Sequence, residues 1–89
     1  MKIEFAKSLS GHDKNKIYLI WKKEGQFAYL VDGRIHTIQK PKKKNEKHYQ
    51  MIKQIPEFIL EQLKEEESLT DNRIYRAVKE YDRSISRRQ

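Results

Sequence analysis

The spacing of hydrophobic residues changes near residue 52, and this change constrains the fold more than any other feature of the sequence. Before it, short apolar runs alternate with polar residues and are separated by turn residues, a pattern typical of β-strands. After it, apolar residues recur about every 3.6 positions, a pattern typical of amphipathic helices. The sequence therefore predicts a small β-rich unit over residues 1–51 and a helical extension over residues 52–89.

The first 39 residues contain the signals for four short strands. Runs rich in β-branched and aromatic residues predict the first three, near Ile3–Phe5, at Ile17–Trp21 and at Phe27–Val31. The pair Asp32-Gly33 follows them. It favours a tight type I′ hairpin turn, because both central residues of such a turn have positive φ. We therefore expect a fourth strand to return directly from this turn.

The returning strand is expected to place Ile35 and Ile38 in the interior of the sheet. A fifth strand is expected at residues 48–51, where it can close the sheet. Five short strands with close turns predict a small curled antiparallel sheet or barrel. The expected fold class is mainly β with α, a five-stranded small barrel followed by two C-terminal helices.

The two helices are expected over about residues 56–67 and 71–86. Pro56 suits a first helical turn. Thr70 suits an N-cap, and Asp71 places a negative charge in the first turn, where it complements the helix dipole. Because neither helix can bury its apolar stripe alone, we expect the helices to pack on each other or on the sheet. The stripe of the last helix comprises Ile74, Ala77, Val78, Tyr81 and Ile85.

The chain of 89 residues carries a net charge of +7, and the charges are segregated along the sequence. The net charge is +3 over residues 1–39, +4 over 40–48, −4 over 56–67 and +3 over 70–89. A basic protein of this kind attracts polyanions, chiefly nucleic acid. The absence of cysteine excludes disulfides and thiolate catalysis and suits a reducing cytoplasm. We expect a cytoplasmic protein without a membrane segment, because the longest apolar run is far shorter than a membrane span.

Three stretches of the first half resemble a known family. Ser10–Lys16 resembles the glycine–basic loop that follows the first strand of KOW-motif proteins. Tyr29–Arg34 and Gln39–His48 resemble one subgroup more closely. This subgroup comprises short bacterial KOW-domain RNA-binding proteins, which are similar to a large-subunit ribosomal protein of archaea and eukaryotes. The resemblance covers about residues 3–50.

The resemblance implies an SH3-like barrel that binds ribosomal RNA or other structured RNA through its loops, with ribosomal proteins as further partners. Gly11 matches the characteristic glycine of the motif, and Asp32 and Gly33 belong to the matched Val-Asp-Gly-Arg stretch. Asn15 departs from the pattern, since many members have glycine there. Asparagine also tolerates left-handed φ, so we expect the turn to form. The helical second half is a further departure, to which the family pattern assigns no role.

The lysine-rich segment 40–48 is the first candidate for nucleic-acid contact, and we expect it to be a basic loop. Pro41 disfavours a helix and keeps the preceding residue extended. Successive lysines then point to different sides of the chain and can contact phosphates. A solvated sheet edge that resists aggregation explains the same lysines. The candidates in this segment are Lys40, Lys42, Lys43, Lys44, Lys47 and His48.

Two other segments carry candidate phosphate ligands. The first loop presents His12, Lys14 and Lys16, although an ordinary polar turn has the same composition. The last helix has an arginine face opposite its apolar stripe. Arginine makes bidentate contacts to phosphate, although a solvated helix face explains the same pattern. The candidates are Arg34, beside the predicted hairpin turn, and Arg73, Arg76 and Arg83 on the helix.

The acidic segment 57–67 is not expected to contact RNA. Glu65, Glu66 and Glu67 can dock a basic protein surface, pair with the arginine face or form a solvated helix end. The acidic and basic faces of the helical half also support a second class of function, a protein-interaction adaptor. In that case the apolar stripe of the helices would be buried against a partner.

Catalysis has little support in the sequence. His12, His36 and His48 are scattered and lack metal-ligand spacing. The chain also lacks a phosphate-binding glycine loop. We expect no enzymatic activity, no cofactor and no metal. The favoured function is binding of structured RNA. The sequence does not separate RNA from DNA, because the 2′-hydroxyl is recognised through geometry.

Overall fold

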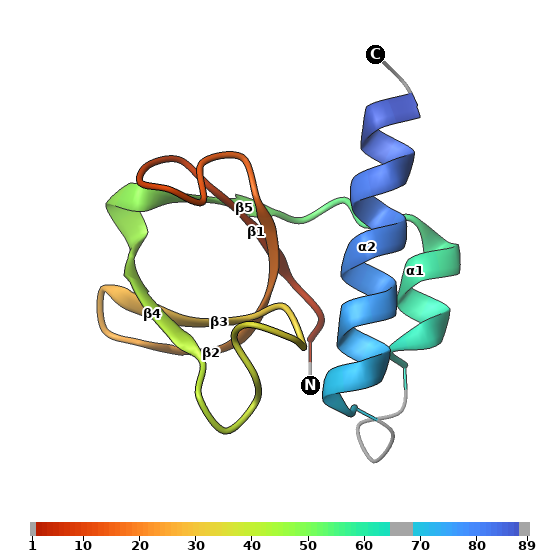
Figure 1. The fold of residues 1–89 in the computed structure, drawn as a ribbon, viewed down its shortest axis with the longest axis horizontal. Coiled ribbons are helices and arrows are strands. Elements are labelled where there is room, and N and C mark those ends of the chain that lie inside the picture. Colours follow the sequence, from red (N-terminus) through yellow and green to blue (C-terminus); the bar gives the residue numbers. More distant parts are fainter. Residues whose placement is uncertain (1, 65–68, 88–89) are drawn as a thin grey trace.

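A computed structural model of the chain describes residues 2–64 and 69–87. Strands followed by two helices confirm the predicted order of elements (Figure 1). Within the described residues, no helix is both long enough and apolar enough to cross a membrane. The elements are β1 (Phe5–Ser8), β2 (Ile17–Glu24), β3 (Phe27–Val31), β4 (Lys42–Asn45), the 3-10 helix η1 (Glu46–His48), β5 (Tyr49–Ile52), α1 (Glu57–Gln62) and α2 (Asp71–Arg87).

The five strands form one antiparallel sheet in the order β4-β3-β2-β1-β5. The last strand returns to pair with the first, so that Ser8 faces Tyr49 and Phe5 faces Ile52. The register of β2 shifts between Ile20 and Lys22, and such a bulge increases local bending and twist. The sheet curls round strongly in Figure 1, with β4 and β5 as its two edge strands.

The fourth strand does not lie where the sequence predicted it. Residues 33–41 form a loop, and the strand that returns along β3 is part of the lysine-rich segment itself, with Lys43 opposite Tyr29. The segment predicted to be a basic loop is therefore β4 followed by η1. Ile35 was expected in the interior but is 72% exposed. Ile38 does pack against the core, although from the loop.

The side chain of Asp32 explains why the predicted hairpin turn is wrong. Gly33 has φ 82°, but Asp32 does not have the positive φ that a type I′ turn needs. Its carboxylate instead accepts hydrogen bonds from the backbone N–H groups of Arg34 at 2.9 Å and His36 at 2.8 Å. These bonds hold the chain in a wider loop, because an aspartate side chain can replace a backbone partner.

Apolar side chains cover both faces of the sheet. The outer face carries Phe5, Ile17, Leu19 and Val31, which share one hydrophobic cluster with α1 and α2 (Figure 1). The inner face carries a second cluster. This arrangement explains the continuous apolar run at the start of β2, since successive residues point to opposite faces. The inner cluster comprises Ala6, Tyr18, Ile20, Ala28, Leu30 and Tyr49.

The last helix begins as predicted. Thr70 Oγ1 accepts a hydrogen bond from the backbone N–H of Arg73 at 3.2 Å, which is the N-cap interaction. Asp71 has a role that the sequence did not show, because its Oδ1 accepts a hydrogen bond from the backbone N–H of Ile38 at 2.8 Å. The apolar stripe packs as expected against the sheet and α1. Its buried members are Ile74, Ala77, Val78 and Tyr81.

The first helix is shorter than predicted. It spans Glu57–Gln62, and Pro56 occupies the N-cap position before the first turn. Leu63 follows as the C-cap and is buried in the outer cluster. Residues 65–67, the glutamates assigned to the end of this helix, lie outside the described residues.

Gly33, on the loop after β3, lies directly against the backbone of α2. A Cβ atom at this position would overlap the carbonyl oxygen of Asp71 and would lie 2.7 Å from the backbone nitrogen of Tyr75. Both atoms belong to the helix backbone and cannot rotate away. The position therefore requires glycine for its space as well as for its φ of 82°.

Replacing Gly33 by alanine is expected to lower the free energy of unfolding by about 2–4 kcal/mol, since it adds a backbone clash to an unfavourable φ. Gly25→Ala is the matched control, because Gly25 has φ 60° but nothing within 4 Å of the added Cβ. The control should lose only about 1 kcal/mol. Urea unfolding of both variants measures the difference, and equal losses would contradict the contact with α2.

Candidate nucleic-acid interface

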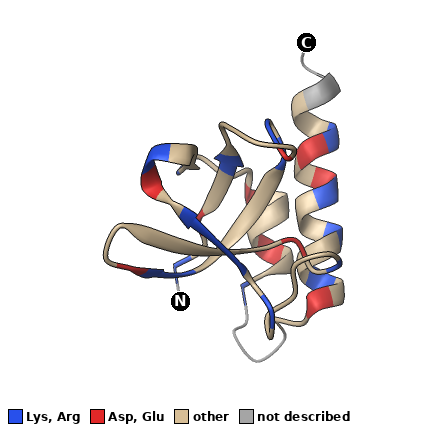
Figure 2. Ribbon diagram, turned by 60° about the vertical axis from the view of Figure 1, so that its left-hand side comes forward, with Lys and Arg blue, Asp and Glu red and all other residues tan. Residues whose placement is uncertain are grey.

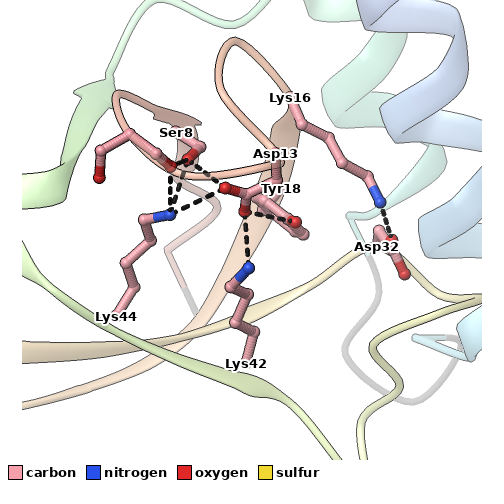
Figure 3. Close-up of polar contacts among 8 residues, drawn as sticks. Ser8, Asp13, Lys16, Tyr18, Asp32, Lys42 and Lys44 are labelled. Carbon is pink, nitrogen blue, oxygen red and sulfur yellow. Dashed lines mark hydrogen bonds and ion pairs between the residues drawn. The ribbon is translucent and has the colours of Figure 1, made fainter.

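Asp13, in the loop between β1 and β2, is the centre of a polar cluster on the inner side of the sheet (Figure 3). Its Oδ2 accepts hydrogen bonds from Lys42 Nζ at 2.9 Å and from Tyr18 Oη at 2.8 Å. Its Oδ1 accepts hydrogen bonds from Lys44 Nζ at 3.0 Å and from Ser8 Oγ at 2.8 Å. Both carboxylate oxygens are thus satisfied, and two lysines of β4 are paired inside the protein.

The alternation of side chains along β4 separates its three lysines. Residues of a strand point to opposite faces in turn, so Lys42 and Lys44 share one side and Lys43 points to the other. The Lys44 side chain is only 10% exposed, and its Nζ also donates to Ser8 Oγ at 2.7 Å. Lys43 is exposed, and its Nζ lies 4.4 Å from the centroid of the Phe27 ring.

The cluster strongly shifts two pKa values. Burial raises the pKa of Asp13, but the hydrogen bonds from Lys42, Lys44, Tyr18 and Ser8 outweigh it and hold the pKa far below its usual range. Burial, followed by the hydrogen bond to Asp13, raises the pKa of Tyr18 well above its ordinary value. At neutral pH the carboxylate is therefore ionised, and the phenol remains a hydrogen-bond donor.

A second buried carboxylate binds a further lysine. Asp32 Oδ2 lies 2.7 Å from Lys16 Nζ, in addition to the two backbone N–H groups that its other oxygen binds. Burial raises the pKa of Asp32, but the Lys16 hydrogen bond and these backbone bonds lower it further, so the net shift is downward. Lys16, like Lys42 and Lys44, is thus engaged within the protein.

The other predicted RNA-binding residues are exposed. The structure places the first loop beside β4 and η1, through the Asp13 cluster and through a hydrogen bond from Leu9 N–H to the carbonyl oxygen of His48 at 2.8 Å. We call the exposed basic residues of the first loop, β4 and η1 together the first basic surface. It comprises His12, Lys14, Lys43, Lys47 and His48.

The arginines of α2 belong to a different part of the molecule. Because α2 packs on the outer face of the sheet and the Asp13 cluster lies on the inner face, they form a second basic surface, Arg73, Arg76 and Arg83. Arg73 and Arg76 line a hollow of about 410 Å³ near the start of the helix. Figure 2 shows basic residues both along β4 and on α2. Arg34 and Lys40 lie on the loop that leads from β3 to β4.

The role of Asp13 was not predicted from the sequence. Two features of the sequence pointed to it. Consecutive lysines in an extended segment must point to alternate sides, and the otherwise basic first loop contains a single carboxylate. Connecting them requires the knowledge that Asp13 and Lys44, 31 positions apart, meet across the sheet. Across residues 2–64 and 69–87, no group of three or more His, Cys, Asp or Glu side chains is arranged to hold a metal ion.

Comparison with known proteins adds no relative. A scan against protein-family models finds no matching family, and a search of curated proteins finds no similar sequence. Function is therefore inferred from the geometry of the site.

Replacing Asp13 by asparagine is expected to lower the free energy of unfolding at pH 7 by about 3 kcal/mol, since two lysines lose their buried partner. The folded-state pKa of Asp13 is depressed, so its stabilisation is present above about pH 4 and lost as the pH falls towards that pKa. The wild type should therefore lose stability below pH 4 more steeply than Asp13→Asn. Urea unfolding at several pH values measures this difference.

The control for this experiment is Glu46→Gln, which removes an exposed carboxylate near the same lysines. Its stability should differ little from that of the wild type at any pH, because exposed charges contribute little. Identical pH profiles for the wild type and Asp13→Asn would show that the cluster does not stabilise the fold.

Proposed function

We propose that the protein binds structured RNA, with ribosomal RNA of the large subunit as its target, through exposed basic side chains. The observation that supports this most is that part-buried ionic hydrogen bonds hold the first loop beside β4, and a backbone hydrogen bond from Leu9 to His48 holds it beside η1. Lys43 and Lys47, together with His12 and Lys14, are left exposed. Lysines close to phosphates release condensed counterions and so drive binding. Arg73, Arg76 and Arg83 would extend the contact over a second surface.

We further propose that the curled sheet is an SH3-like barrel of the KOW type. The first loop supports this interpretation, because Gly11, the residue that matches the characteristic glycine of the motif, has φ 86°. Asn15 has φ 73°, the left-handed conformation expected where asparagine replaces glycine. Both residues therefore have the backbone conformation that the resemblance requires.

We propose binding without catalysis. The most suggestive pair for an enzyme is Ser8 and Lys44, whose side chains lie 2.7 Å apart, since a lysine can activate a serine. However, Ser8 is 0% exposed, and its hydroxyl lies 2.8 Å from a carboxylate oxygen of Asp13. A substrate cannot approach this oxygen without opening the sheet. The pair is better explained as part of the buried cluster.

The adaptor function has less support. It depends on an apolar helix stripe that is free to meet a partner, whereas Ile74 and Ala77 are fully buried against the sheet and α1. A partner would have to use the charged faces instead. RNA binding makes fuller use of the exposed cations, and we therefore place it first.

Sedimentation of cell lysate on sucrose gradients, with and without RNase, tests the proposal. The protein is expected to co-migrate with large-subunit particles and to leave them after RNase treatment. A complex that resists nuclease and sediments away from ribosomes would contradict RNA binding and favour the adaptor.

A further inference from the structure

A groove of about 290 Å³ lies between α2 and the loop that follows β3. Apolar side chains from three segments line it, and cationic side chains stand beside them. Pockets for drug-sized ligands have about 300–1,000 Å³, so this volume suits a single nucleoside-sized group. The residues that matter for recognition are Ile17, Ile35 and Val78 among the apolar ones, and Arg34 and Lys79 among the cations. The carboxylate of Asp82 also lines the groove, and that of Asp32 pairs there with Lys16.

Two cations of the groove, Arg34 and Lys79, lie around one aromatic ring, that of Tyr75. The Arg34 guanidinium lies 4.0 Å from the centroid of the Tyr75 ring, a distance typical of a cation–π contact. Lys79 Nζ donates a hydrogen bond to Tyr75 Oη at 3.0 Å. Arg34 and Lys79 are thus held at the groove by the same tyrosine. Lys16 is already neutralised by Asp32, at 2.7 Å.

The groove is preformed. The backbone of Gly33 touches the backbone of α2, and the N–H of Ile38 donates to Asp71 at 2.8 Å. These two contacts fix the loop on the helix at both ends of the segment that carries Arg34 and Ile35. A fixed groove binds a ligand without the cost of ordering a loop.

The exposure of Ile35 in this groove is unexpected for a large apolar side chain. It is 72% exposed although the chain has few large apolar residues to spare for its core. Its side chain lines the groove on the same loop as Arg34. An exposed apolar side chain next to a planar guanidinium is suited to a flat, partly apolar group. Unpaired nucleobases are such groups, and proteins bind them by stacking on arginine and aromatic planes.

We propose that this groove receives one unpaired nucleobase of the bound RNA. The base would contact Ile35 and stack on the Arg34 plane, while Lys79 would contact the adjoining phosphate. This inference rests on the proposed RNA binding and specifies what the RNA must contain. Phosphate contacts position an RNA without selecting it, whereas a base in a groove selects a bulge or loop over a continuous duplex.

The test compares two RNA hairpins that differ only by one bulged nucleotide, with binding measured by fluorescence anisotropy at several salt concentrations. The wild type should bind the bulged hairpin about tenfold more tightly, which lies within the usual contribution of one stacked base. Arg34→Lys keeps the charge but removes the plane, and Ile35→Ser removes the apolar contact. Each variant should lose most of the preference and keep the salt dependence.

Matched controls separate the groove from the surface as a whole. Arg87→Lys, at the end of α2 and outside both basic surfaces, is the control for Arg34→Lys, and Phe58→Ser, which alters an exposed apolar residue of α1, is the control for Ile35→Ser. Both controls should retain the tenfold preference.

The two proposals fail in different ways. Salt-dependent binding of both hairpins with equal affinity, or an unchanged preference in Arg34→Lys and Ile35→Ser, would overturn the base site and leave RNA binding intact. No binding of either hairpin by the wild type would overturn both. Shifts of the groove amides in NMR spectra with an acidic peptide, and none with the bulged hairpin, would also overturn the base site.

Discussion

The hydrogen bonds and ion pairs made by the Asp13 carboxylate are the interactions on which the rest of the structure depends. A partly desolvated ionised group is stable only when charged and polar partners surround it, and this one has two lysines, a phenol and a hydroxyl. Because those partners come from β1, β2 and β4, the carboxylate joins the first loop to three strands. This carboxylate thus holds the first loop, which carries His12 and Lys14, against β4, which carries Lys43.

The lysines of β4 therefore have two different roles. Lys42 and Lys44 point inward and hold the sheet edge to the loop, whereas Lys43 points outward. A strand can carry so much like charge because alternate residues face different surroundings. On the outer side of the sheet, α2 belongs to the outer hydrophobic cluster, and its backbone lies against Gly33. The basic residues thus lie on a sheet that is held by the Asp13 contacts on its inner face and by the helices on its outer face.

Local patterns in the sequence predicted much of this fold. The runs that became β2 and β3, the strand near residue 49 and the N-cap of α2 were all visible, because each depends on neighbouring residues. The position of β4 was not predicted, since lysines have low strand propensity and Asp13, the partner of Lys42 and Lys44, is 29 and 31 positions away from them. The prediction of a tight hairpin turn at Asp32 was wrong for a similar reason. The carboxylate of Asp32 binds Lys16, which is distant in sequence, as well as two backbone N–H groups of the loop. Exposed cations were identified from composition, but their division into paired and exposed lysines required the tertiary structure.

The salt dependence of RNA binding tests the central claim most directly. Lys43→Ala/Lys47→Ala removes two cations of the first basic surface, and Lys53→Ala/Lys64→Ala removes two exposed cations outside both surfaces. The slope of log K against log salt concentration should weaken by roughly 1.4–1.8 in the first variant, since each lost phosphate contact contributes about 0.7 on a single strand and about 0.9 on duplex DNA. It should be unchanged in the second. If the two double variants weaken the slope to the same extent, net charge alone drives binding, and the account is contradicted.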